Sequence, residues 1–232
     1  MTTGINVKSL QGILWLCLLA LLIMPPANAA CTDKREPGMD WSGCRKANKM
    51  LDRENFSGSR FDDAVLTSTL FDDSTFTNAS LVKADISRAS FKKSRLVKTD
   101  LTKAVGYRAN FDHATLVGTK MSKSEFSRAS FHHAIISDVD WSRAELGRID
   151  LFAAQLKNVS FEFSNLSRAR FEKSQLENVN FSGAYTYQTH FENADLGNVQ
   201  NLSQAQLDMA CGDTRTRLPE GSKIPTTWPC TE

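Results

Sequence analysis

Large apolar residues recur at every fifth position over most of this chain. Between Phe56 and Leu196, 27 of the 29 residues in this series are Phe, Leu, Ile, Met or Trp, and only Gly106 and Thr186 depart. Two places before each of these centre residues stands Ala, Ser, Thr or Val, again in 27 of 29 cases. A helix returns its apolar face about every 3.6 residues and a strand about every two, so neither explains the pattern. A chain that turns a corner every five residues does explain it.

Several of the five-residue units match a known motif when they are read from the small residue. Ala84–Arg88, Ala109–His113 and Ala194–Asn198 follow the pattern A(D/N)LXX. On these residues the chain resembles the pentapeptide-repeat family, over about 145 residues without a slip of register. The resemblance implies an all-β fold, namely a right-handed quadrilateral parallel β-helix with four units per coil. The 29 units then give a little over seven coils.

Four units per coil place residues that are twenty apart above one another. We therefore expect four interior columns, and one of them is nearly all phenylalanine. Its members are Phe71, Phe91, Phe111, Phe131, Leu151, Phe171 and Phe191. Such rings can stack from coil to coil.

The first 29 residues are typical of a secretory signal peptide. Lys8 lies in a short polar segment, the apolar run 13–24 follows, and residues 27–29 supply a small-x-small cleavage pattern. The run is too short to span a bilayer stably. We expect cleavage, a periplasmic or secreted protein, and no stable membrane insertion afterwards. An uncleaved anchor is one alternative, and lipidation of Cys31 is another, although Asn28 differs from the branched apolar residue that a lipidation signal has there.

The rest of the chain divides into three segments. Residues 30–54 are expected to form an N-terminal cap, residues 55–200 the β-helix, and residues 201–232 a C-terminal cap. Ser203 is a suitable N-cap residue, so a short helix is expected to begin there.

Four cysteines fall in the two caps, two in each. Because the whole stack separates the ends, and a disulfide needs Cα atoms about 4.4–6.8 Å apart, we predict the pairs Cys31–Cys44 and Cys211–Cys230. Disulfides fit an oxidising compartment. A zinc site is the alternative, but two cysteines at each end do not complete a tetrahedral site.

No nucleophile elbow, phosphate-binding loop or metalloprotease helix occurs in the sequence. Large side chains fill the tube, so any activity must lie on an outer wall. We therefore expect a protein that is not an enzyme and has no cofactor. The net charge of +2 does not identify a partner.

The last outward position of each unit is rich in cations, and two columns result. The lysine column comprises Lys83, Lys103, Lys123 and Arg143, and the arginine column comprises Arg88, Arg108, Arg128, Arg148 and Arg168. Tyr107, Tyr185 and Tyr187, together with the irregular centres Gly106 and Thr186, fall on the side of the arginine column. We predict that these arginines and tyrosines form a binding wall for an anionic envelope polymer, such as a glycan, or for a protein. An ordinary solvated surface is the alternative.

His113 is expected one coil above His133, with Asp112 above His132. Two imidazoles and a carboxylate could hold Zn²⁺ or Cu²⁺, so His113 and His133 are the candidate metal ligands. Repeat duplication of surface histidines is the alternative.

The leading hypothesis is a non-enzymatic periplasmic or envelope binding or scaffold protein. A cell-envelope carbohydrate enzyme on the same wall is the second hypothesis. Members of the family that resemble double-stranded DNA protect topoisomerases through an acidic groove, but this chain has a basic column and a signal for export. We therefore expect neither that activity nor a nucleic-acid partner.

Overall fold

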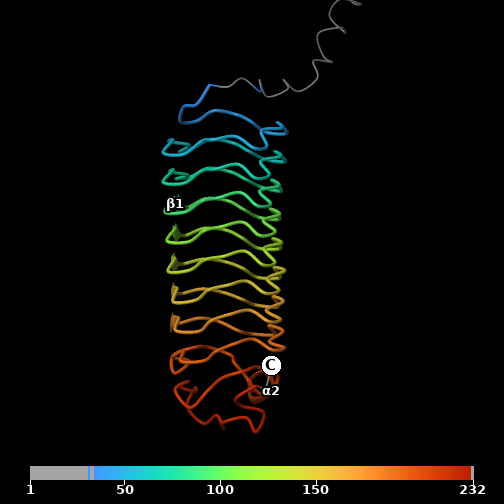
Figure 1. Ribbon diagram of the computed structural model, residues 1–232, viewed down its shortest axis with the longest axis vertical. Coiled ribbons are helices and arrows are strands. Elements are labelled where there is room, and N and C mark those ends of the chain that lie inside the picture. The colour runs from blue at the N-terminus through green and yellow to red at the C-terminus, as the bar shows by residue number, and fades with distance from the viewer. Residues whose placement is uncertain (1–30, 32–33, 231–232) are drawn as a thin grey trace, which may run out of the picture. The chain divides into compact units, whose positions relative to one another are not determined.

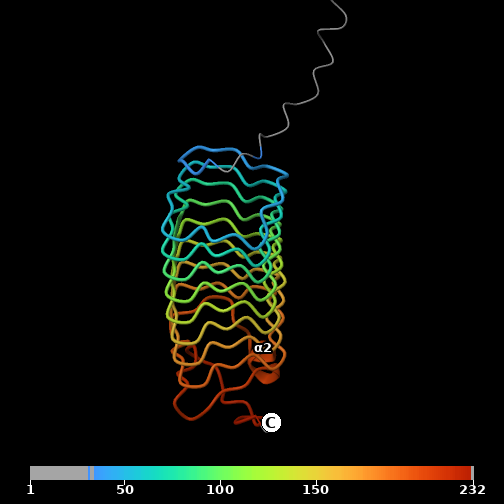
Figure 2. The same cartoon turned by 45° about the horizontal axis from the view of Figure 1, so that its top comes forward.

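The computed structural model describes residue 31 and residues 34–230. These residues belong to one compact unit, Cys31–Glu232. Within it the chain winds into a stack of coils that progress in order from residue 34 towards residue 230 (Figure 1; Figure 2). The predicted signal peptide, residues 1–29, lies outside the described residues. Among the described residues, no helix has the length and apolar character needed to cross a membrane.

Residues twenty apart pair in parallel throughout the stack. A continuous series of bridges leads from Asp40 to Gln200 in eight steps of twenty residues. The parallel β-helix with four five-residue sides per coil is therefore confirmed. Regular pairing begins at residue 40, inside the segment 30–54 that the sequence assigns to the cap.

One side of the helix forms continuous strands, and the other sides pair mainly through isolated bridges. The strands follow one another in chain order in a single parallel sheet, with leucine or isoleucine at each buried centre. They are β1 (Arg95–Val97), β2 (Thr115–Val117), β3 (Ile135–Ser137), β4 (Gln155–Lys157) and β5 (Gln175–Glu177).

The backbone conformation at the corners favours particular residue types at two outward positions of each repeat. At most corners the second residue after the centre has a positive φ, for example 57° at Lys93 and 61° at Gly118. A non-glycine residue pays about 1 kcal/mol or more for that conformation. Aspartate or asparagine before the centre supports the turn, because its side chain accepts a hydrogen bond from the backbone N–H two residues on. Asp85 accepts in this way from Ser87 at 3.0 Å.

Stacked aromatic rings fill much of the tube, and the buried serine and threonine residues beside them form hydrogen bonds with the backbone. The rings of Phe91 and Phe111 lie 4.8 Å apart and nearly parallel, and Phe111 and Phe131 lie 4.7 Å apart. The predicted phenylalanine column is therefore confirmed. Where the small residue carries a hydroxyl, it finds a backbone acceptor, as when Thr99 Oγ1 donates to the Phe76 carbonyl at 2.6 Å. This bond satisfies a buried polar group that would otherwise be costly.

The two irregular centres are explained by packing. A Cβ atom on Gly106 would lie 2.6 Å from Cδ1 of Phe126, so the phenyl ring of the next coil occupies the space that a large side chain would fill. Thr186 is fully buried, and its hydroxyl donates to the carbonyl of Gln206 at 2.8 Å. Both residues therefore have structural roles inside the tube.

At the N-terminal end, the Cys31–Cys44 disulfide joins Cα atoms 5.7 Å apart. Lys46 occupies a centre position, where most other repeats have a large apolar residue, and it is only 6% exposed. Its ammonium group donates to the Cys31 carbonyl at 2.8 Å and lies over the Trp41 ring. A cation can occupy an interior column here because the end of the tube gives it a polar acceptor.

At the C-terminal end, helix α2 (Gln204–Met209) begins after the N-cap residue Ser203, with a full capping box. The buried amide of Gln206 donates to the carbonyls of Phe181 and Ala184. The Cys211–Cys230 disulfide joins Cα atoms 5.4 Å apart. The predicted short helix and both predicted disulfides are therefore confirmed, and the cap supplies donors to the open edge of the last coil.

Candidate functional site

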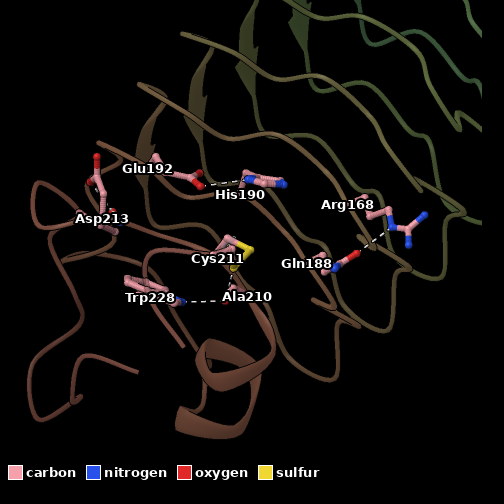
Figure 3. Close-up of a disulfide and its surroundings, with 10 residues drawn as sticks. Arg168, Gln188, His190, Glu192, Ala210, Cys211, Asp213 and Trp228 are labelled. Carbon is pink, nitrogen blue, oxygen red and sulfur yellow. Dashed lines mark hydrogen bonds and ion pairs between the residues drawn. A yellow bond between two sulfur atoms is a disulfide. The ribbon is translucent and has the colours of Figure 1, made fainter. Parts of the chain in front are cut away.

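The five members of the arginine column are all exposed and project from successive corners on one side. Their φ angles lie between 57° and 61°, so each side chain leaves the coil from the same backbone conformation. Within residues 34–230, no carboxylate pairs with any of them. Arg168 Nε donates to Gln188 Oε1 at 2.9 Å (Figure 3). Neighbouring coils are about 4.8 Å apart, so the column carries closely spaced positive charge.

A shallow groove of about 420 Å³ runs beside the C-terminal part of this column. We call it the arginine groove. Its lining consists of Ser127, Arg128, Gly147, Arg148, Asn165, Ser167, Arg168, Tyr185 and Tyr187. Ser127, Gly147 and Ser167 lie above one another, twenty residues apart, and their small size leaves the hollow. A Cβ atom on Gly147 would be 3.5 Å from Ser167 Oγ, so backbone crowding does not require glycine here.

Two tyrosines line the C-terminal part of the groove. The rings of Tyr185 and Tyr187 lie 6.2 Å apart at an interplanar angle of 14°, and they are 49% and 43% exposed. Tyr107 lies four coils before Tyr187 on the same side, where the Arg108 guanidinium lies 5.3 Å from its ring centroid. The structure thus brings Arg128, Arg148, Arg168, Tyr185 and Tyr187 together in the groove. Arg88, Arg108 and Tyr107 are on the same side but do not line it.

The opposite edge of this side carries carboxylates and an amide. Glu125, Glu145 and Asn165 pair in succession across neighbouring coils. Asn165 Nδ2 donates to a Glu145 carboxylate oxygen at 2.9 Å. The side therefore offers cations along one edge and hydrogen-bond acceptors along the other, with small polar residues between them.

The two histidines predicted as metal ligands stack on one another. The rings of His113 and His133 lie 5.2 Å apart and within 10° of parallel. Ring-nitrogen lone pairs lie in the ring planes, so those of two parallel stacked rings do not converge on one ion. The nearby Asp112 carboxylate accepts hydrogen bonds from the His132 backbone N–H and the Ser130 hydroxyl. This geometry favours stacking at the corner over shared metal binding.

A different group of ligand-type side chains does converge. Among the described residues, one set of three His, Cys, Asp or Glu side chains has its ligand atoms within 4.8 Å of one another, and it consists of Glu172, His190 and Glu192. We call it the carboxylate–histidine cluster. Our sequence interpretation did not include it. Folding the chain at twenty residues stacks Glu172 under Glu192, with His190 two places earlier, so the sequence does contain the signal.

Hydrogen bonding within the cluster changes the affinity of its groups for protons. Nδ1 of His190 and Oε1 of Glu192 are 3.0 Å apart (Figure 3). This hydrogen bond raises the pKa of His190, although burial acts in the opposite direction. Burial raises the pKa of Glu192. The hydrogen bond from His190, the charge of His190 and a hydrogen bond from the backbone N–H of Glu192 itself outweigh burial, so the pKa is lowered overall. The pair therefore favours a charged imidazolium beside a charged carboxylate.

Similar solved structures share the repeat. HetL, a pentapeptide repeat protein involved in heterocyst differentiation regulation from the cyanobacterium Nostoc sp. strain PCC 7120, is 19% identical, with a TM-score of 0.46 over 96% of this chain and 98% of HetL. QnrB1, a plasmid-mediated fluoroquinolone resistance protein, is 17% identical, with a TM-score of 0.44 over 79% of this chain and 90% of QnrB1. A pentapeptide repeat protein from the Arabidopsis thaliana thylakoid lumen is 24% identical, with a TM-score of 0.30 over 50% of this chain and 74% of its own.

No curated protein sequence matches the chain significantly. The family model for pentapeptide repeats does match, with eight copies over residues 55–92, 84–122, 154–185 and 174–210. These ranges cover more than half of the chain and coincide with the stacked coils that the structure describes. The chain belongs to the pentapeptide-repeat family.

Proposed function

We propose that this chain is a non-enzymatic binding protein of the cell envelope, and that its arginine groove binds an acidic polysaccharide. The observation that carries the proposal is the groove itself. Three arginines without carboxylate partners line it, together with an exposed pair of tyrosine rings and a floor of small polar residues.

The chemistry of the two edges selects the ligand class. Guanidinium groups bind carboxylates or sulfates through charge-assisted hydrogen bonds. Glu125 and Glu145 on the other edge accept hydrogen bonds, so they suit hydroxyl groups and disfavour a second row of anions. A polymer of sugar acids carries anionic groups and hydroxyls together, and the exposed rings of Tyr185 and Tyr187 add a flat apolar surface.

The proposed location is the periplasm or the cell exterior. The signal peptide expected at residues 1–29 supports export. A disulfide at each end of the stack supports an oxidising compartment. Envelope polysaccharides are then within reach of the groove, whereas cytoplasmic nucleic acid is not.

An envelope carbohydrate enzyme on the same side is the second candidate. It is favoured by one observation, namely that a backbone β-bridge places Glu125 and Glu145 next to each other on adjacent coils. Both side chains are exposed, however, and a carboxyl group that acts as a general acid is usually kept in an apolar environment. We therefore propose binding without catalysis.

The test compares two triple variants of the full chain that lose the same charge. Arg128→Ser/Arg148→Ser/Arg168→Ser removes the cations of the groove. Lys103→Ser/Lys123→Ser/Arg143→Ser removes three cations of the neighbouring corner, whose φ angles are also between 56° and 59°. Binding to polygalacturonate is measured at increasing salt, with dextran as the neutral polymer and duplex DNA as a second polyanion.

We expect the arginine variant to bind polygalacturonate at least about tenfold more weakly with a smaller salt slope, while the lysine variant stays near the parent. Gly147→Leu, which fills the groove at constant charge, should weaken binding to a similar degree. Equal loss in both triple variants, or equal binding to DNA, would show attraction to positive charge in general and would refute the groove. Release of shortened oligosaccharides would support the enzyme.

A further inference from the structure

The carboxylate–histidine cluster lies beside the C-terminal cap, in a pocket of about 580 Å³ whose lining includes Cys230. We propose that Glu172, His190 and Glu192 bind one divalent transition-metal ion, such as Zn²⁺. Their ligand atoms are within 4.8 Å of one another, and His190 Nδ1 and Glu192 Oε1 are 3.0 Å apart. Zinc bonds of about 2.0–2.2 Å place neighbouring tetrahedral ligands about 3.3 Å apart, so the side chains need to move by about 1 Å.

Two carboxylate oxygens in the cluster are buried without a hydrogen-bond partner. They are Glu172 Oε2 and Glu192 Oε2. A buried polar atom without a partner is costly, and it is most costly on a charged group. A cation held between the two glutamates would satisfy both oxygens at once. This observation is independent of the spacing of the ligand atoms, and it points to the same ligand.

Arg170 is the positive group closest to the cluster, and its bonds offset its charge. Its Nε donates to Glu172 Oε1 at 2.9 Å, and its Nη1 donates to Asp150 Oδ2 at 2.9 Å. Asp150 and Glu172 are the two carboxylates that pair with the Arg170 guanidinium, and Arg148 and Arg168 line the same pocket. Arg170 also holds Glu172 by Oε1 alone, so Oε2 stays available. Supporting contacts of this kind commonly orient metal ligands.

The ligand set identifies the class of ion. An imidazole nitrogen with two carboxylates suits Zn²⁺ and its neighbours among the transition metals, whereas Ca²⁺ and Mg²⁺ prefer oxygen ligands throughout. Three protein ligands leave one tetrahedral position open. Arg148 and Arg168 line both this pocket and the arginine groove, so an anionic group could occupy that position.

The test titrates the full chain with Zn²⁺ alone by calorimetry at pH 7.5. His190→Gln and Glu192→Gln are the test variants, and both are close in shape to the parent residues. His113→Gln/His133→Gln is the matched control, because it removes the other histidine pair. Thermal unfolding of every variant checks the fold. A crystal of the parent protein soaked in Zn²⁺, with anomalous scattering, locates the ion without any substitution.

We expect one Zn²⁺ per chain at pH 7.5, at least about tenfold weaker binding in each test variant, and no change in the control. Anomalous density between the three side chains would support the site even if a variant failed to fold. Absence of Zn²⁺ binding by the parent chain would overturn the proposal, as would unchanged binding by His190→Gln. Loss of binding in the control alone would assign the ion to His113 and His133 instead.

Discussion

At the scale of the residue, the backbone conformation at each corner decides which substitutions are tolerated. Lys92 and Lys93 are neighbouring exposed lysines, but only Lys93 has a positive φ, at 57°. Glycine adopts that conformation without steric cost, while elsewhere it costs chain entropy. The same substitution should therefore have different effects at two adjacent positions.

We predict that Lys92→Gly lowers the free energy of unfolding by about 1 kcal/mol more than Lys93→Gly does. Urea unfolding of the two variants beside the parent measures the difference, and each variant loses the same charge. Equal destabilisation at both positions would contradict the corner conformation.

A single carboxylate organises the turn at residue 213 of the C-terminal cap. Burial raises the pKa of Asp213, but hydrogen bonds from the Arg215 side chain, the backbone N–H groups of Asn193 and Arg215 and the Thr216 hydroxyl outweigh it and lower the pKa from 3.8 to about 2. A lowered folded-state pKa contributes stability above the unfolded value, and this contribution is lost as the pH falls towards the folded value. The relevant range is therefore pH 4 to pH 2.

We predict that Asp213→Asn lowers the melting temperature at pH 7 by about 2–4 °C, because solvent screening keeps the effect near 1 kcal/mol. The difference from the parent should shrink between about pH 4 and pH 2, where the parent carboxylate also becomes neutral. Calorimetric scans at pH 7, 4 and 2.5 measure it. A difference that is independent of pH would show that the charge on Asp213 has no stabilising role.

At the scale of the element, each interior side chain packs against side chains of its own coil and against those of the coils on either side. Gly106 departs from the five-residue pattern, yet the Phe126 ring fills its place. A large residue at 106 would restore the motif and crowd the ring. Overpacking of this kind typically costs about 1–3 kcal/mol, so a large apolar residue at position 106 should lower the stability of the fold although it matches the motif.

We predict that Gly106→Leu destabilises the protein by about 1–3 kcal/mol. Phe126→Leu alone leaves a cavity and should also destabilise the protein, whereas the double variant should be more stable than the sum of the two single effects predicts. Chemical unfolding of all four proteins gives the coupling. Additive effects would mean that the two positions do not share one space.

Periodicity predicts the columns because each side of the coil buries the same two positions. Periodicity predicts less well at the N-terminal cap and on the outer surface, where a coil packs against something other than an identical coil. The sequence analysis places residues 30–54 in the cap, yet the backbone pairs like the rest from residue 40 onward, and Lys46 stands at a centre position with its ammonium group on the Cys31 carbonyl. Likewise, the spacing of the repeats predicts the arginine column. The groove depends on three small residues on successive coils, Ser127, Gly147 and Ser167, and no single repeat contains that information.

At the scale of the whole molecule, stability is close to a sum over neighbouring coils, so the two ends are the weak points. The C-terminal cap covers the last coil through α2, the Cys211–Cys230 disulfide and a bridge between Asp195 and Arg217. Without this cover, backbone groups of the last coil would be free to pair with another chain.

We predict that a chain ending at residue 200 associates end to end, while the full chain remains monomeric at the same concentration. Sedimentation velocity measures the mass of each, and circular dichroism confirms that the shortened chain keeps its β-structure. A shortened chain that stays monomeric and equally stable would show that the cap does not protect the edge.

The proposed function requires the arginine groove to be the surface that this solenoid presents to an acidic polysaccharide. The most direct measurement is a crystal structure of the protein with a galacturonate tetrasaccharide. We predict density along Ser127, Gly147 and Ser167, with ligand carboxylates within hydrogen-bond distance of Arg128 and Arg148 and a sugar ring against Tyr185 or Tyr187. A tetrasaccharide bound along the lysine column, or on the strands β1–β5 and not in the groove, would contradict it.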